Sequence, residues 1–241
     1  MTTPAAIPTK SPPSTHSEPS EPTVADATNV NVAHHFDEWE QQYDSCVLGM
    51  WVFLVSEVMF FGGLFATYMV YRFKFPDAFD HASEHLDIYL GGFNTFVLLT
   101  SSLTMALAVR AAHLGQRRQI ALLIALTMVL GLAFLGVKGL EYYHKYEDGL
   151  APLLGLPFRY EGSEVGATRL FYGLYFAMTG VHALHMIIGI AILGLFIRPA
   201  LRGAYSGANS LSVEIVGLYW HFVDLVWIFL FPLLYLIDRS A

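Results

Sequence analysis

The stretch Tyr219-Trp220-His221-Phe222-Val223-Asp224-Leu225-Val226-Trp227 sets a histidine and a carboxylic acid inside an apolar run long enough to cross a bilayer. An ionisable side chain near the centre of a bilayer costs about 2.5–3.5 kcal/mol on insertion scales. Trp220, Asp224 and Trp227 recur at helical spacing and form one stripe. We expect this stripe to face protein, with Asp224 accepting a hydrogen bond from His221 or a tryptophan N–H, or to serve in proton or lipid handling.

The same chain contains five apolar runs of the length that a membrane span requires, at about 20 residues or more. They cover residues 47–71, 88–112, 119–141, 169–197 and 213–236. Hydrophobic residues make up 55% of the chain and charged residues 14%, which excludes an ordinary soluble domain. Runs this long satisfy their backbone groups in lipid only as helices. The sequence therefore predicts an all-α, polytopic membrane helical bundle with five transmembrane helices, and places Pro76, Pro157 and Pro199 in the connections.

The residues before the first run differ in composition from the rest of the chain. Residues 1–33 are rich in Pro, Ser, Thr, Ala and Glu, which predicts a disordered tail without the pattern of a signal peptide. Residues 34–46 are acidic and aromatic, which indicates a short interfacial segment before the domain of residues 47–241. The net charge of −7 argues against nucleic-acid binding, and the lone Cys46 excludes an intrachain disulfide.

The basic residues of the connections favour one orientation. Two short connections on the same side as the N-terminus hold a dense group of arginines, whereas the opposite side holds its basic residues in longer segments. The positive-inside rule then places the N-terminus in the cytoplasm. The dense group is Arg110, Arg117, Arg118, Arg198 and Arg202.

Glu57 is the most deeply placed acid of the first span. It lies about ten residues into the run, or about 15 Å at the rise of a helix, which is near the midplane. It is either a proton-exchanging carboxyl or an acid hydrogen-bonded to another helix. His182 and His185 share one face of the fourth span, and they ligate haem or a metal, bond to neighbouring helices, or meet Glu57 and Asp224 in one polar core.

Lys138, Glu141 and His144 lie near the end of the third span. Glu141 and His144 form half of the Glu-x-x-His motif of di-iron bundles, but no second copy lies on a span. The spacing of Lys138 and Glu141 predicts an ion pair in which the lysine reaches the membrane interface. A lipid phosphate is the alternative partner of this lysine.

Several segments resemble one known family, subunit III of the haem-copper cytochrome c oxidases. Residues 218–227 closely resemble the signature of its last helix, and residues 176–189 resemble its penultimate helix. Residues 55–65 resemble the helix that bears a glutamate, and Glu141-Tyr-Tyr resembles the end of the helix between. Asn94-Thr95 with the following Val-Leu-Leu resembles the remaining helix. The resemblance is collinear over residues 47–236.

The resemblance implies a non-redox subunit of a respiratory terminal oxidase, which reduces oxygen and pumps protons. Haem and copper are then expected in partner subunits, and no catalytic or metal-binding residue is expected in this chain. The partners would be subunit I, subunit II, other respiratory subunits and phospholipid bound in a cleft between helix groups. The subunit would support proton uptake and stability of the catalytic subunit, as a multi-pass protein of a bacterial inner membrane.

Individual roles follow from the resemblance residue by residue. Glu57 is expected to be the midmembrane carboxyl, with His185 and Glu141 at the polar positions of the middle helices. The family's mitochondrial pattern has seven helices, of which the first two are missing here, and Lys138 is not part of it. Polar-core candidates are Glu57, His182, His185, His221 and Asp224, and lipid or interface candidates are Lys138, Glu141, Trp220 and Trp227.

Three other functions remain open at this level. A related branch of the family serves quinol oxidases and nitric oxide reductases. A stand-alone membrane metalloenzyme would gather His182, His185, Glu141, His144 and Asp224 around a metal. A proton-coupled transporter would use Glu57 and Asp224 as a relay.

Overall fold

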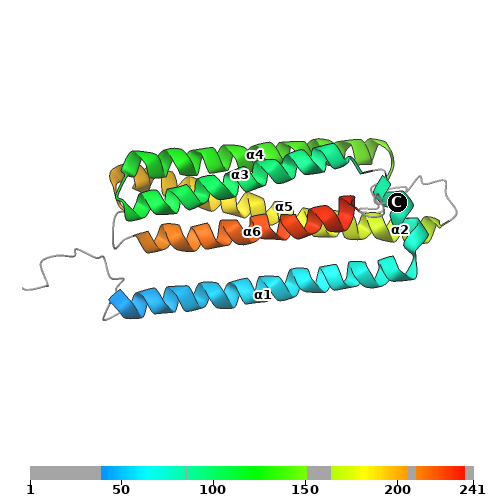
Figure 1. Ribbon diagram of the computed structural model, residues 1–241, viewed down its shortest axis with the longest axis horizontal. Coiled ribbons are helices and arrows are strands. Elements are labelled where there is room, and N and C mark those ends of the chain that lie inside the picture. The colour runs from blue at the N-terminus through cyan, green and yellow to red at the C-terminus, as the bar shows by residue number, and fades with distance from the viewer. Residues whose placement is uncertain (1–38, 85, 151–163, 206–209, 237–241) are drawn as a thin grey trace, which may run out of the picture. The chain divides into compact units, whose positions relative to one another are not determined.

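The computed structural model describes residues 39–84, 86–150, 164–205 and 210–236, which form six helices and no strand (Figure 1). Five of these helices are long and apolar enough to cross a membrane, which confirms the predicted all-α polytopic bundle. Only α2 is too short. The helices are α1 (Trp39–Lys74), α2 (Pro76–Glu84), α3 (Ile88–His113), α4 (Arg117–Glu147), α5 (Val165–Arg202) and α6 (Leu211–Tyr235).

The helices extend beyond the apolar runs at several ends. α1 begins at Trp39, so residues 39–46 of the predicted interfacial segment continue the first span, while residues 34–38 and the tail of residues 1–33 lie outside the described residues. Pro199 lies inside α5, and the prediction that it falls in a connection is wrong. Hydropathy marks where the chain leaves the lipid, whereas backbone hydrogen bonding continues into the water layer.

The connection between the first two spans contains α2, which the apolar pattern of the sequence did not predict. Pro76 is its first residue, where a missing N–H leaves no helical hydrogen bond unmade. The ring of Phe79 is fully buried and makes edge contacts with Tyr68 of α1 and Phe171 of α5. This short helix therefore covers the ends of two spans.

Helices α3 to α6 form the tightly packed part of the bundle. α3 packs on α4, α4 on α5, and α6 on both α3 and α5. α1 contacts α2, α5 and α6 among the described helices, and it runs alongside α6 (Figure 1). Only 11% of the most apolar 18-residue stretch of α1 is buried, against 50% for that of α6. Most of α1 is therefore left to lipid or to partner chains.

Trp220 of α6 contacts three other helices. An added Cβ at Gly131 of α4 or at Gly189 of α5 would lie 3.0 Å from a ring atom of Trp220, so the indole fills the space between these two glycines. Its N–H donates to the hydroxyl of Ser101 on α3, at 3.2 Å. An added Cβ at Gly62 would meet nothing within 4 Å, so close helix approach occurs at only some of the small residues.

Candidate functional site

Glu57 of α1 and His185 of α5 meet across the bundle. Oε2 of Glu57 lies 3.2 Å from Nε2 of His185, at an angle that does not make a well-formed hydrogen bond. Their side chains are 18% and 14% exposed, respectively. His185 therefore contacts Glu57, without the His182 and Asp224 of the predicted polar core, and the pair is a polar contact between α1 and α5.

The other ring nitrogen fixes the tautomer of His185. Nδ1 lies 2.9 Å from the carbonyl oxygen of Val181, which can only accept, so Nδ1 carries a hydrogen. Attraction between Nε2 and the carboxyl then requires one proton between them, either on the acid or on the imidazole.

An open groove of about 550 Å³ leads to this pair between α1, α5 and α6. Tyr219 lies in its wall and donates its O–H to the backbone oxygen of His185, at 3.0 Å. The groove is otherwise almost wholly apolar, so Glu57 and His185 are its chemically active groups. The remaining lining residues are Met50, Phe53, Ile188, Ile192, Ile215 and Val216.

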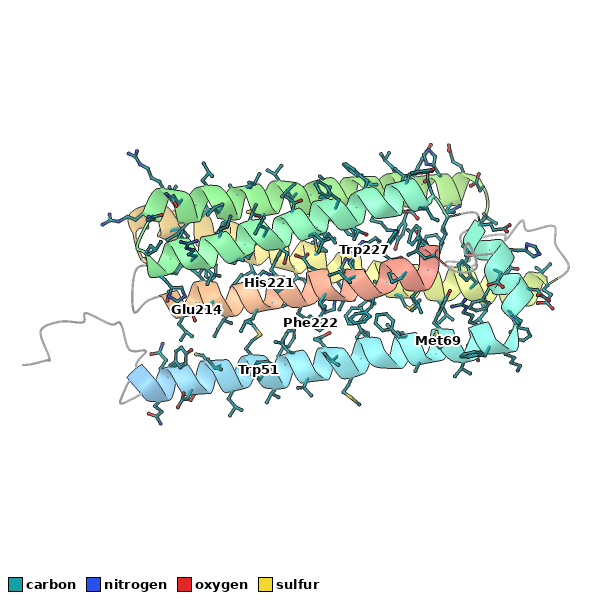
Figure 2. The ribbon with its side chains drawn as sticks, in the orientation of Figure 1. Trp51, Met69, Glu214, His221, Phe222 and Trp227 are labelled. Atoms are coloured by element: carbon teal, nitrogen blue, oxygen red, sulfur yellow. The ribbon has the colours of Figure 1, made fainter. Side chains whose placement is uncertain are left out.

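A second groove of about 200 Å³ lies between α1 and α6 and is wholly apolar. Phe61 of α1 is buried at its edge and makes ring contacts with His185 and with Phe222, at centroid distances of 5.5 and 6.3 Å. Phe222 lies between α6 and α1 (Figure 2). Phe61 thus lies between the polar pair and this apolar groove.

His182 does not join this pair. It lies inside the bundle, 1% exposed, with its ring centroid 5.4 Å from both Phe134 and Trp227. Neither of its ring nitrogens has a hydrogen-bond partner among the described residues. The two histidines therefore occupy different environments, although only three positions separate them.

Asp224 faces α3, as the stripe of α6 predicts. Its Oδ2 lies 3.5 Å from the hydroxyl of Ser101, and Oδ1 has no partner among the described residues. The prediction that His221 or a tryptophan N–H satisfies Asp224 is wrong. His221 bonds to Ser102 at 2.7 Å, because α3 offers hydroxyls at the same level as the acid.

The tryptophan N–H groups also bond to hydroxyls of α3. Trp220 donates to Ser101, and Trp227 donates to Thr95 at 3.1 Å. Sequence reasoning missed these serine and threonine partners, since such residues are common on membrane helices and carry little signal. The α6 stripe is therefore a polar seam along α3.

We expect the Asp224→Ala variant to lose about 1–3 kcal/mol of stability, because the buried hydroxyl of Ser101 on α3 loses an acceptor. Asp224→Asn, which keeps the shape and the acceptor, should lose less. The measurement is the temperature at which the chain separates from its purified complex in mild detergent. Equal midpoints for the wild type and Asp224→Ala would contradict a structural role of this acid.

Lys138 and Glu141 form a buried ion pair where α4, α5 and α6 meet. Nζ of Lys138 lies 3.0 Å from Oε2 of Glu141, and the two residues are 3% and 5% exposed. Nζ also donates to the hydroxyls of Tyr175 and Tyr235, at 3.0 and 2.8 Å. The ion pair is confirmed. The prediction that the lysine reaches the interface is wrong, because α5 and α6 enclose it.

The network around this pair is complete. Tyr175 and Tyr235 donate their O–H groups to Oε1 of Glu141, at 2.7 and 2.5 Å. Nζ also lies 5.2 Å from the ring centroid of Trp227. Lys138, Glu141, Trp220 and Trp227 are therefore in contact with protein rather than with lipid.

The described part of the chain contains no group of three or more His, Cys, Asp or Glu side chains that could hold a metal ion. Glu141, half of the di-iron motif, is occupied by the ion pair. His144 lies on the exposed side of α4. The residues of the metalloenzyme hypothesis are thus not brought together.

Comparison with known proteins identifies the family. A family model described as cytochrome c oxidase subunit III matches residues 155–238. A protein of Thermostichus vulcanus named cytochrome c oxidase subunit 3 is 33% identical over 204 residues, which are 84% of this chain and 92% of that protein. The Synechocystis protein of the same name is 33% identical over 80% of this chain and 76% of its own length.

A quinol oxidase subunit 3 of Bacillus subtilis is 32% identical over 81% of this chain and 88% of its own length. These relatives match across most of both chains, and the five spans agree with the collinear motifs. The chain therefore belongs to the cytochrome c oxidase subunit III family.

Proposed function

We propose that this chain is the non-redox subunit III of a respiratory haem-copper terminal oxidase, and that the Glu57–His185 pair supports proton uptake by the complex. The observation that supports the proton role is a carboxyl and an imidazole 3.2 Å apart in the wall of an open groove. Haem and copper belong to subunits I and II in this proposal. Reduction of oxygen takes place there, and this chain supplies proton-active and structural groups.

The surroundings of Glu57 and His185 support a role in proton transfer rather than in proton storage. A carboxyl and an imidazole in contact exchange a proton without a large movement of either side chain. The groove keeps both groups partly exposed, so a proton can enter and leave. α1, which carries Glu57, has most of its apolar surface free to contact subunit I.

We further propose that the chain lies in a bacterial inner membrane with its N-terminus in the cytoplasm. Arg110, Arg117, Arg118, Arg198 and Arg202 lie at the ends of α3, α4 and α5 on the side where α1 begins. Cytoplasmic connections carry such an excess of basic residues. Phospholipid acyl chains would occupy the apolar groove beside Phe61.

The first experiment tests membership of the complex. The tagged chain is purified from its native membranes in mild detergent, and a reduced-minus-oxidised spectrum is recorded. We expect haem bands that disappear when partner subunits are stripped away. A colourless preparation without large partners would refute the oxidase assignment. Cytochrome c and a soluble quinol, offered in turn to the complex, identify the electron donor.

The second experiment tests the proton role. The Glu57→Gln variant should assemble with a normal ratio of haem to chain, because the amide keeps the shape of the acid. Its proton uptake during turnover should fall by about tenfold at most, less than the 10²–10⁴-fold expected for a catalytic acid or base. Stopped-flow recording with a pH-sensitive dye measures this rate in reconstituted vesicles.

The matched control is Asp224→Asn, which removes a buried acid away from the groove and should leave proton uptake unchanged. His185→Gln should reproduce the defect of Glu57→Gln. If Glu57→Gln takes up protons at the rate of the wild type, the pair has only a structural role. If it prevents assembly, its role is docking.

A further inference from the structure

A third groove, of about 440 Å³, lies on the hairpin formed by the end of α3 and the start of α4. It is separate from the groove of Glu57, because α1 has no contact with α3 or α4 among the described residues. Arg110, Gln116 and Gln119 supply its polar wall. Leu107, Leu114 and Leu123 supply its apolar wall.

The polar side chains of this groove have no hydrogen-bond or ion-pair partner within the described part of the chain. The side chains of Arg110, Gln116 and Gln119 make no ion pair or hydrogen bond there, and all three are exposed. α4 begins beside them without a side-chain cap and without an acidic residue in its first turn. A helix N-terminus carries a partial positive charge, so this corner combines a free guanidinium with a second source of positive potential.

Two residues of the apolar wall, Leu107 and Leu123, lie on the membrane side of these groups, whereas Leu114 lies in the turn between α3 and α4. Leu107 precedes Arg110 by three residues, or about 4.5 Å along α3, and Leu123 lies about 9 Å into α4. Leu107 and Leu114 are 40% and 60% exposed. The groove therefore changes from polar to apolar over the depth at which a phospholipid changes from its phosphate to its acyl chains. A free phosphate would use only the polar wall.

We propose that this groove binds one anionic phospholipid, with its phosphate held between the Arg110 guanidinium and the N-terminus of α4. The amides of Gln116 and Gln119 donate to the remaining phosphate oxygens. The first part of an acyl chain lies along Leu107 and Leu123. This site goes beyond the proposed function and does not depend on the proton role of Glu57.

Lipid retention by the purified complex tests the site. Wild-type, Arg110→Gln and Arg118→Gln complexes are washed with detergent containing dioleoylphosphatidylglycerol or dioleoylphosphatidylcholine, and bound lipids are counted by native mass spectrometry. Arg118 is the matched control, since it is an exposed arginine at the same end of the bundle and does not line the groove.

We expect the wild type and Arg118→Gln to retain one more phosphatidylglycerol than Arg110→Gln, with no such difference for phosphatidylcholine. Equal retention by all three complexes would refute the site. Equal loss in both variants would show attraction by diffuse charge instead. Loss of a partner subunit from Arg110→Gln without a change in lipid count would assign Arg110 to an acidic protein partner, which also overturns the proposal.

Discussion

The Glu141→Ala variant is expected to lose about 3–5 kcal/mol of stability and to fail in assembly, because it leaves a buried cation without its counter-ion. Lys138 is enclosed by Tyr175, Tyr235 and Trp227 and is 3% exposed. The two tyrosine hydroxyls that now donate to Glu141 would lose their acceptor in the same step. Titration of the purified complex with a denaturing detergent measures the loss.

The two halves of this ion pair should respond unequally. Lys138→Met should cost less than Glu141→Ala, because Glu141 keeps the O–H groups of Tyr175 and Tyr235 as donors. The double variant Lys138→Met/Glu141→Gln should recover part of the loss, since no buried charge remains. Equal losses for the two single variants would contradict the idea that the unpaired cation sets the cost.

The Trp220→Ala variant is expected to lose about 3–5 kcal/mol, the range measured when a large aromatic side chain is removed from a packed core. The indole is fully buried and fills the space between Gly131 and Gly189, so its removal leaves a cavity where three helices meet. The Ser101 hydroxyl also loses its donor. Thermal dissociation of the chain from the complex measures this effect.

Gly131 provides the control for Trp220. Gly131→Ala places a methyl group 3.0 Å from Cη2 of the indole and should destabilise the wild-type bundle. In a Trp220→Phe background that ring atom is absent, so the same Gly131→Ala change should cost little. Additive losses in the double variant would show that the glycine and the tryptophan do not act through contact.

The sequence predicted the five spans because length and hydropathy report directly on the lipid. It did not predict the ends of α1 and α5, since the helical backbone continues where the apolar pattern stops. It missed α2, whose apolar positions are few and fit a pattern too short to stand out from a connection.

The sequence predicted which residues belong to the candidate site, but it did not predict which of them contact one another. The depth of Glu57 indicates that it needs a partner, but three histidines lie on the spans and only the packing selects His185. The enclosure of Lys138 depends on Tyr175 and Tyr235, which come from two later helices. Sequence position gives the depth of a side chain in a membrane, whereas the neighbours at that depth depend on how the helices rotate and pack.

The narrow contact of α1 with the other spans has a consequence for biosynthesis. α1 is made first, yet apart from α2 its contacts are with α5 and α6, which are made last. At about 5–20 residues per second, α1 stands in the bilayer for on the order of ten seconds before α5 emerges. During that interval Glu57 has no His185 to contact. We expect insertion machinery or an already folded subunit to shelter that acid until synthesis of the chain is nearly complete.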